Sequence, residues 1–184
     1  SELEKAFRAS LFDLLNKRGH SVSVAMDKQS HIIVTPSGKQ WTLKEQVTLK
    51  NHGQVTIPHF VFRCEAEDAV ISVYADGFHY HASEQHNRIA DDAAKRHELR
   101  QEGHIVWNVT WDDVAALRAA LTNGTDIPPR VEVAPHEIVV EAKKSITEMG
   151  GEVDDVALVA ANPIEWLARV LDEPDWQRWQ RLAQ

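Results

Sequence analysis

The hydrophobic pattern of the chain begins with a helical period. Apolar residues recur every three or four positions near the N-terminus, at Leu3, Phe7, Leu11, Leu14 and Leu15. This spacing places them on one face of a helix. Gly19, a residue type that commonly ends helices, then predicts that this helix stops near residue 18.

Short apolar runs separated by polar turns follow the predicted helix. The runs lie at 22–26, 32–34, 41–49 and 55–62. Runs of this kind predict the strands of an antiparallel meander. The next run, 70–75, is almost continuously apolar, which is typical of a central strand that is buried on both faces.

The pattern returns to a helical period after residue 87. Ile89, Ala93 and Leu99 share one face, and Gly103 closes the segment. These features predict a second helix that follows the central strand.

A further strand is predicted at 104–109, and a helix after it. Thr110 and Asp113 have the spacing of a capping box at the start of that helix. A strand, a helix and another strand in this order predict a crossover unit. We therefore expect the strands at 57–63, 69–75 and 104–109 to be neighbours in one mixed sheet.

The domain organisation changes after residue 121. Adjacent Asn-Gly and Pro-Pro pairs predict a linker at 122–135. Two later segments begin with Pro163 and Pro174, and proline suits the first turn of a helix. We therefore predict one domain at 1–121 and a short helical tail, or the start of a further region, at 136–184.

The tail contains three of the six tryptophans, Trp166, Trp176 and Trp179, with few apolar neighbours in the sequence. We expect it to dock on the first domain or on another part of a larger protein. The chain opens on Ser1 and not on Met, which also suggests a piece of a longer polypeptide.

Charge is distributed unevenly along the chain. Its net charge is −8, yet residues 1–64 contain 9 Lys and Arg against 5 Asp and Glu. Residues 65–121 contain 5 against 11, and residues 122–184 contain 6 against 12. The basic first third favours contacts with nucleic-acid phosphates, whereas the acidic remainder favours a protein-interaction role.

The composition also limits the compartment. A single cysteine, Cys64, excludes an internal disulfide framework and fits a reducing environment. No apolar run approaches the roughly 20 residues that a membrane span needs. We therefore expect a cytoplasmic protein without a membrane partner.

Potential metal ligands gather behind the predicted central strand. Asp76 ends that strand, and His79 and His81 follow it closely. Side chains at a sheet edge can converge on one point, and the next helix brings Asp92 and Lys95 near it.

A His-x-His pair after a β-rich stretch is also typical of cupin-like metal sites. Such sites take a glutamate four or five residues after the second histidine and then continue into strands. Here Glu84 follows His81 by three residues, and a helix is predicted next. The spacing therefore fits the cupin alternative less well.

Residues 55–114 resemble the core of Vsr-type endonucleases, a branch of the PD-(D/E)XK nucleases. The resemblance rests on the Asp76-Gly77 strand end, on the aromatic-His pair at 80–81, and on Asp92, which lies eleven residues before Gly103. It implies a restriction-endonuclease-like α/β fold, with a mixed sheet flanked by helices. Similar modules stand at the C-terminal end of large bacterial DEAD/DEAH-box helicase-like proteins, some of them in phage defence. The resemblance therefore implies DNA and a helicase-like remainder of the same polypeptide as partners.

The chain departs from this family at two positions that would hold a divalent ion. The aspartate at the family's strand start corresponds to His59, and a carboxylate of some relatives corresponds to Tyr74. Mg²⁺ prefers hard oxygen ligands, so these replacements weaken its binding. The remaining set of His59, Asp76 and His81 suits Zn²⁺ or Mn²⁺ better.

These departures favour a degenerate nuclease that positions DNA or partner domains, with no cofactor or with such a softer metal ion. One alternative is an active metal-dependent DNA endonuclease, in which Asp76, His81, Asp92 and Lys95 carry the chemistry around one ion. A second alternative is a protein-interaction domain without a DNA role.

Ordinary structural interpretations of the same residues stay open. An aspartate before glycine is a common turn former, and Asp92 suits the first turn of a helix. Lys95 and Arg96 fit solvated charges on a helix surface. Most of the ten histidines, His104 among them, fit surface or half-buried positions.

Overall fold

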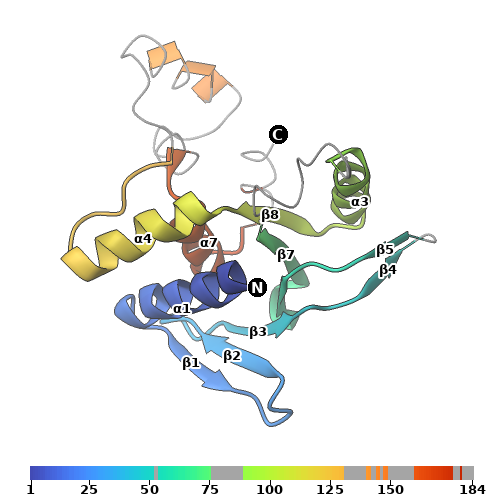
Figure 1. Ribbon diagram of the computed structural model, residues 1–184, viewed down its shortest axis with the longest axis horizontal. Coiled ribbons are helices and arrows are strands. Elements are labelled where there is room, and N and C mark those ends of the chain that lie inside the picture. Colours follow the sequence, from blue (N-terminus) through green and yellow to red (C-terminus); the bar gives the residue numbers. More distant parts are fainter. Residues whose placement is uncertain are drawn as a thin grey trace.

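The computed structural model describes residues 1–51, 54–75, 89–130 and 160–175, together with 140, 141, 144, 145, 147, 148 and 179. Its main elements in chain order are α1 (Glu2–Lys17), β1 (Ser21–Val24), β2 (Ser30–Val34), β3 (Gln40–Glu45), β4 (Leu49–Asn51), β5 (Gln54–Thr56), β6 (Phe60–Cys64), the 3-10 helix η1 (Glu65–Glu67), β7 (Ala69–Ala75), α3 (Ile89–Gln101), β8 (Ile105–Val109), α4 (Trp111–Asn123) and α7 (Pro163–Asp172). Figure 1 shows these helices arranged around the sheet.

Six of the described strands form one mixed sheet, in the order β1-β2-β3-β6-β7-β8. Neighbouring strands are antiparallel except β7 and β8, which run parallel. The chain passes from β7 to β8 through the segment that contains α3, as a crossover requires. The α/β class and the adjacency of β6, β7 and β8 confirm the prediction from the sequence.

Helix α1 begins and ends where local chemistry favours it. Ser1 and Glu4 form a capping box, in which each side chain bonds the backbone of the other residue. The helix ends before Gly19, whose φ of 85° suits glycine. Its predicted apolar face is buried against the sheet.

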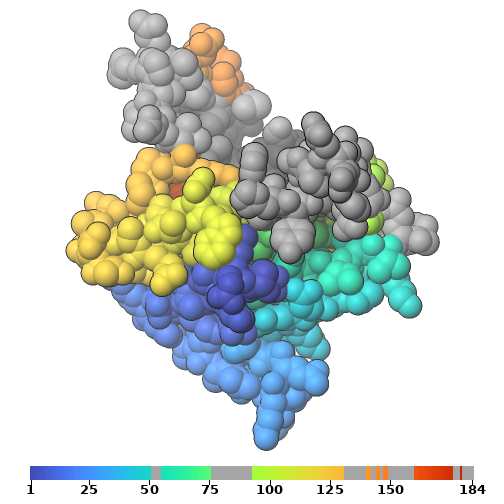
Figure 2. Space-filling model, in the orientation of Figure 1, coloured from blue at the N-terminus to red at the C-terminus, as the bar shows by residue number. Residues whose placement is uncertain are grey.

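Helix α4 has the predicted capping box at its start. The Thr110 side chain accepts a hydrogen bond from the backbone N–H of Asp113, and the Asp113 carboxylate accepts one from the backbone N–H of Thr110 at 2.8 Å. The helix ends at Asn123, and Gly124, which caps it, has left-handed backbone angles. Helices α1 and α4 lie side by side over the sheet (Figure 2).

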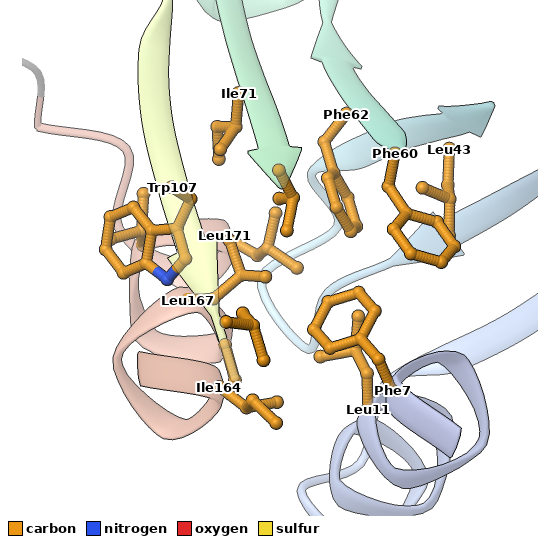
Figure 3. Close-up of a cluster of buried hydrophobic side chains, with 14 of the residues drawn as sticks. Phe7, Leu11, Leu43, Phe60, Phe62, Ile71, Trp107, Ile164, Leu167 and Leu171 are labelled. Atoms are coloured by element: carbon orange, nitrogen blue, oxygen red, sulfur yellow. The ribbon is translucent and has the colours of Figure 1, made fainter. Parts of the chain in front are cut away.

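One apolar core joins α1, the sheet, α4 and α7. Figure 3 shows side chains from α1, the strands and α7 pointing toward one another, including Phe7, Phe60, Ile71, Trp107 and Leu167. The rings of Phe7 and Phe60 lie 4.9 Å apart between their centroids. Burial of this apolar surface is the main source of stability in such a domain.

The tail helix α7 is part of this core. The indole N–H of Trp41 donates to the carbonyl of Leu171 at 3.0 Å, and the indole N–H of Trp107 donates to the carbonyl of Pro163 at 2.9 Å. These bonds satisfy polar groups that are buried among apolar side chains. Of the two alternatives for the tail, docking on the first domain is therefore confirmed for α7. The boundary at residue 121 stays a prediction.

Two predicted strand runs are divided differently in the structure. The run at 41–49 ends as a sheet strand at Glu45, and Leu49 begins β4. The run at 55–62 is two strands, β5 and β6, separated at Pro58, which has no N–H for a ladder. Strands β4 and β5 form a hairpin that projects from the sheet (Figure 1).

No helix within the described residues is both long enough and apolar enough to cross a membrane.

Candidate functional site

The candidate site lies at the carboxyl end of β7, beside the start of β6. The register places Phe60 opposite Val73, so His59 lies beside Tyr74. The first turn of α1 reaches the same edge, because His59 Nε2 is 3.9 Å from a carboxylate oxygen of Glu4. Figure 1 shows the N-terminus near this end of β7.

Tyr74 is buried on the sheet face opposite α1. Its neighbours Val73 and Ala75 belong to the core, and side chains alternate along a strand. The Tyr74 hydroxyl lies 2.8 Å from Thr56 Oγ1, and the guanidinium carbon of Arg96 lies 4.5 Å from the ring centre. The phenol thus joins β5, β7 and α3 through a hydrogen bond and a cation–π contact.

His59 is held by the backbone of β7. Its Nδ1 accepts a hydrogen bond from the N–H of Ala75 at 3.0 Å. A neutral imidazole that accepts at Nδ1 carries its proton on Nε2, on the side of Glu4. A metal ligand needs a free lone pair on nitrogen. The predicted role of His59 in a metal site therefore requires a different hydrogen-bond arrangement.

Glu4 supplies a negative charge to this edge. Its carboxylate accepts hydrogen bonds from the Ser1 hydroxyl at 2.7 Å and from the Gln46 amide at 2.7 Å. Partial burial pushes the pKa of Glu4 upward, but the hydrogen bonds from Ser1 and Gln46 act in the opposite direction, and the pKa is lowered overall. Glu4 and Gln46 could not be predicted as neighbours of the site, because both are distant from β7 along the chain.

The other predicted site residues are described only in part. Asp76, His79 and His81 lie outside the described residues, as does the side chain of Asp92. Lys95 is half-buried on α3. Among the described residues, no group of three or more His, Cys, Asp or Glu side chains is arranged to hold a metal ion.

Arg96 differs from the solvated helix charge that the sequence suggests. It is half-buried, and its guanidinium covers the face of Tyr74. A charged group over a ring in a partly desolvated position stabilises by about 0.5–2 kcal/mol. Arg96 therefore covers the ring of Tyr74 on the side of α3.

His104 and Ser72 form a second polar pair on the same sheet face. Ser72 is fully buried, and its Oγ lies 2.9 Å from His104 Nδ1. Burial lowers the pKa of His104, the positive charge of Arg63 lowers it further, and Glu102 partly offsets both.

Two basic residues of the first third of the chain extend this face toward β3. Arg63 lies opposite Thr42 in the β3–β6 pair, and Lys44 lies two residues further along β3. Lys44 and Arg63 are therefore diagonal neighbours on one side of the sheet, and both are exposed. The charge count of the sequence predicted a basic first third, but it could not show which of these charges lie together on the folded sheet.

Comparison of the chain with protein-family models, with curated proteins and with solved structures gives no match in any of the three.

Proposed function

We propose that this domain is a nucleic-acid-associated module of a larger helicase-like protein, a degenerate relative of Vsr-type nucleases that does not cleave DNA. The observation that carries the proposal is that the side chains at positions 59 and 74, which correspond to carboxylates in that family, bond other groups of the fold. His59 accepts the N–H of Ala75, and Tyr74 bonds Thr56 beneath Arg96. Both side chains are engaged in packing contacts of the fold.

The loss of two carboxylates has a large effect on phosphodiester hydrolysis. A divalent ion stabilises the developing negative oxygens and activates water, and this contribution amounts to several kcal/mol. Each loss of about 1.4 kcal/mol slows a reaction tenfold. A site without its oxygen ligands is therefore slower by several orders of magnitude.

Binding to nucleic acid does not depend on that metal. Phosphate contacts through lysine and arginine are sequence-independent and weaken as salt rises. Lys44 and Arg63 present two exposed charges on one sheet face. This arrangement supports weak, salt-sensitive DNA binding on the face that also contains Tyr74.

One set of DNA assays tests both parts of the proposal. We expect the wild-type chain to leave duplex and single-stranded DNA intact in Mg²⁺, Mn²⁺ and Zn²⁺. His59→Asp returns an oxygen ligand to the strand start and is the variant in which metal-dependent cleavage should first reappear. Robust wild-type cleavage that is lost in Asp76→Ala would instead establish the active endonuclease.

The same preparations report DNA binding. We expect Lys44→Glu/Arg63→Glu to reduce affinity about tenfold or more at low salt and to flatten its salt dependence. The matched control is Lys5→Glu/Lys17→Glu, which makes the same charge change on exposed positions of α1, across the sheet. Equal losses in both variants would show that only net charge matters and would contradict a binding face.

A further inference from the structure

The sheet has an open edge at β1. In the described part of the chain, β1 pairs with β2 on one side and with no strand on the other, and Figure 1 shows it as the outermost strand. Proteins usually protect such edges by keeping the strand very short, or with charged residues or proline. Strand β1 has four residues, and residues 21–26 contain no charged residue and no proline. The side chains of Val24 and Met26 are 62% and 101% exposed.

The backbone groups that face the open side belong to two valines. The N–H of Ala25 donates to the carbonyl of Ser30 at 2.9 Å, so Ala25 occupies a hydrogen-bonded position opposite Ser30. Hydrogen-bonded pairs alternate along an antiparallel ladder, so Ser23 also bonds β2. The N–H and C=O groups of Val22 and Val24 therefore point away from β2.

Side chains along β1 alternate in the same period. Val22 packs against the apolar core, so it lies on the face of the sheet toward α1. Val24, two residues on, lies on that same face, and Ser23 lies on the opposite face. Ser21 and Ser23 are both exposed.

We propose that β1 pairs antiparallel with β1 of a second copy of this chain, with the two-fold axis at Ser23. In this register Val22 of each copy lies opposite Val24 of the other and exchanges backbone hydrogen bonds with it. Ser23 lies opposite Ser23 of the second copy, in a non-hydrogen-bonded pair. Among the registers that pair the outward backbone groups of Val22 and Val24, this one matches both valines with valine and Ser23 with serine.

This self-complementary pattern is the reason to choose a second copy as the partner. A two-fold contact at this register places Ser23 opposite its own copy, so a charged residue at that position would meet a like charge and repel it. An edge of serine and valine has no such penalty. The contact involves one four-residue strand from each copy, whereas stable specific interfaces bury roughly 1,200 Å² or more. We therefore expect weak association that increases with protein concentration.

Sedimentation equilibrium over a wide range of concentrations tests the pairing. We expect the wild type to shift toward dimer as concentration rises. Ser23→Lys brings two like charges together at the axis and should raise the dissociation constant several-fold. Ser21→Lys is the matched control, because it adds the same charge to the same strand and face but lies opposite Ala25 of the second copy.

A charge exchange makes the test specific to the register. Ser23→Asp alone should also weaken the dimer, whereas a mixture of Ser23→Asp and Ser23→Lys should associate more tightly than either variant alone. A wild type that stays monomeric at the highest concentration would overturn the proposal. So would equal effects of Ser23→Lys and Ser21→Lys, or a mixture without recovery.

Discussion

The two faces of the sheet present different kinds of side chain. On the face toward α1, α4 and α7, the strands present side chains such as Phe62, Ile71 and Trp107, which join one apolar cluster. On the opposite face, strands β6 and β7 present Arg63 and Ser72, and each of these acts on His104 through charge or a hydrogen bond. The first face is stabilised mainly by buried apolar area, and the second depends on individual polar partners.

This difference determines how each face tolerates substitution. An apolar face accepts many residues of suitable size and keeps its stability. A polar face depends on pairs, because a buried donor or acceptor that loses its partner costs about 1–3 kcal/mol. A substitution on the polar face therefore has to preserve or replace both members of a pair, such as Tyr74 and Thr56.

The largest expected effect comes from the apolar face. Leu167 of α7 is fully buried, so Leu167→Ala should lower the free energy of unfolding by about 2–5 kcal/mol. Because α7 shares the core with the sheet, the whole transition should move to lower urea. Circular dichroism and tryptophan fluorescence, followed together during urea denaturation, measure this.

The matched control is Arg169→Ala, which changes an exposed residue on the same helix. It should alter the free energy of unfolding by no more than about 0.5 kcal/mol. Two separate unfolding transitions, with that of the sheet unaffected by Leu167→Ala, would show that α7 unfolds independently. Such a result would contradict the description of α7 as part of the apolar face.

A smaller effect is expected on the polar face. Tyr74→Phe removes the hydroxyl next to Thr56 Oγ1 but keeps the ring under Arg96. The free energy of unfolding should fall by about 0.5–1.5 kcal/mol. Thr56→Val should cost a similar amount, and the double variant should cost less than the sum, because the second change removes a partner already lost. Strict additivity in this double-mutant cycle would show that the two groups do not interact.

The apolar face could be predicted from the sequence because its signals are local. The spacing of Leu3, Phe7 and Leu11 defines a helix face, and the Thr110 and Asp113 pair defines a helix start. Periodicity indicates which side of an element is buried but not what covers it. The bond from Trp41 to the Leu171 carbonyl, between residues far apart in the sequence, is therefore invisible in the pattern.

The polar face could be predicted only in outline. The resemblance to Vsr-type nucleases marked positions 59 and 74 as places of an ion ligand, and that role stays a prediction. The register shows only that the two residues lie opposite each other. The resemblance could not show that His59 accepts the N–H of Ala75, because the role of a ring nitrogen depends on its neighbours in space. The position of Arg96 over Tyr74 depends on how α3 packs, which no local spacing determines.

The smallest expected effect is a pH dependence that also belongs to the polar face. The pKa of His104 in the folded protein lies below its ordinary value of 6.5, first because the ring is partly buried and then because Arg63 is near. The unfolded chain therefore binds more protons than the folded one as pH falls below about 6.5. The stability that comes from neutral His104 is complete above that pH and is lost as pH falls through the folded pKa. His104→Asn keeps a polar group near Ser72 but cannot titrate, so its free energy of unfolding should depend less on pH between about 7 and 5. Urea denaturation of both proteins at several pH values gives the difference between their free energies of unfolding. The other histidines are present in both proteins, so their contributions cancel in this difference.

The variant Arg63→Gln provides a second check, because it removes the nearby positive charge. His104 should then titrate closer to 6.5, and the slope of stability against pH should lie between those of the wild type and His104→Asn. Parallel curves for all three proteins would contradict the account of this pair.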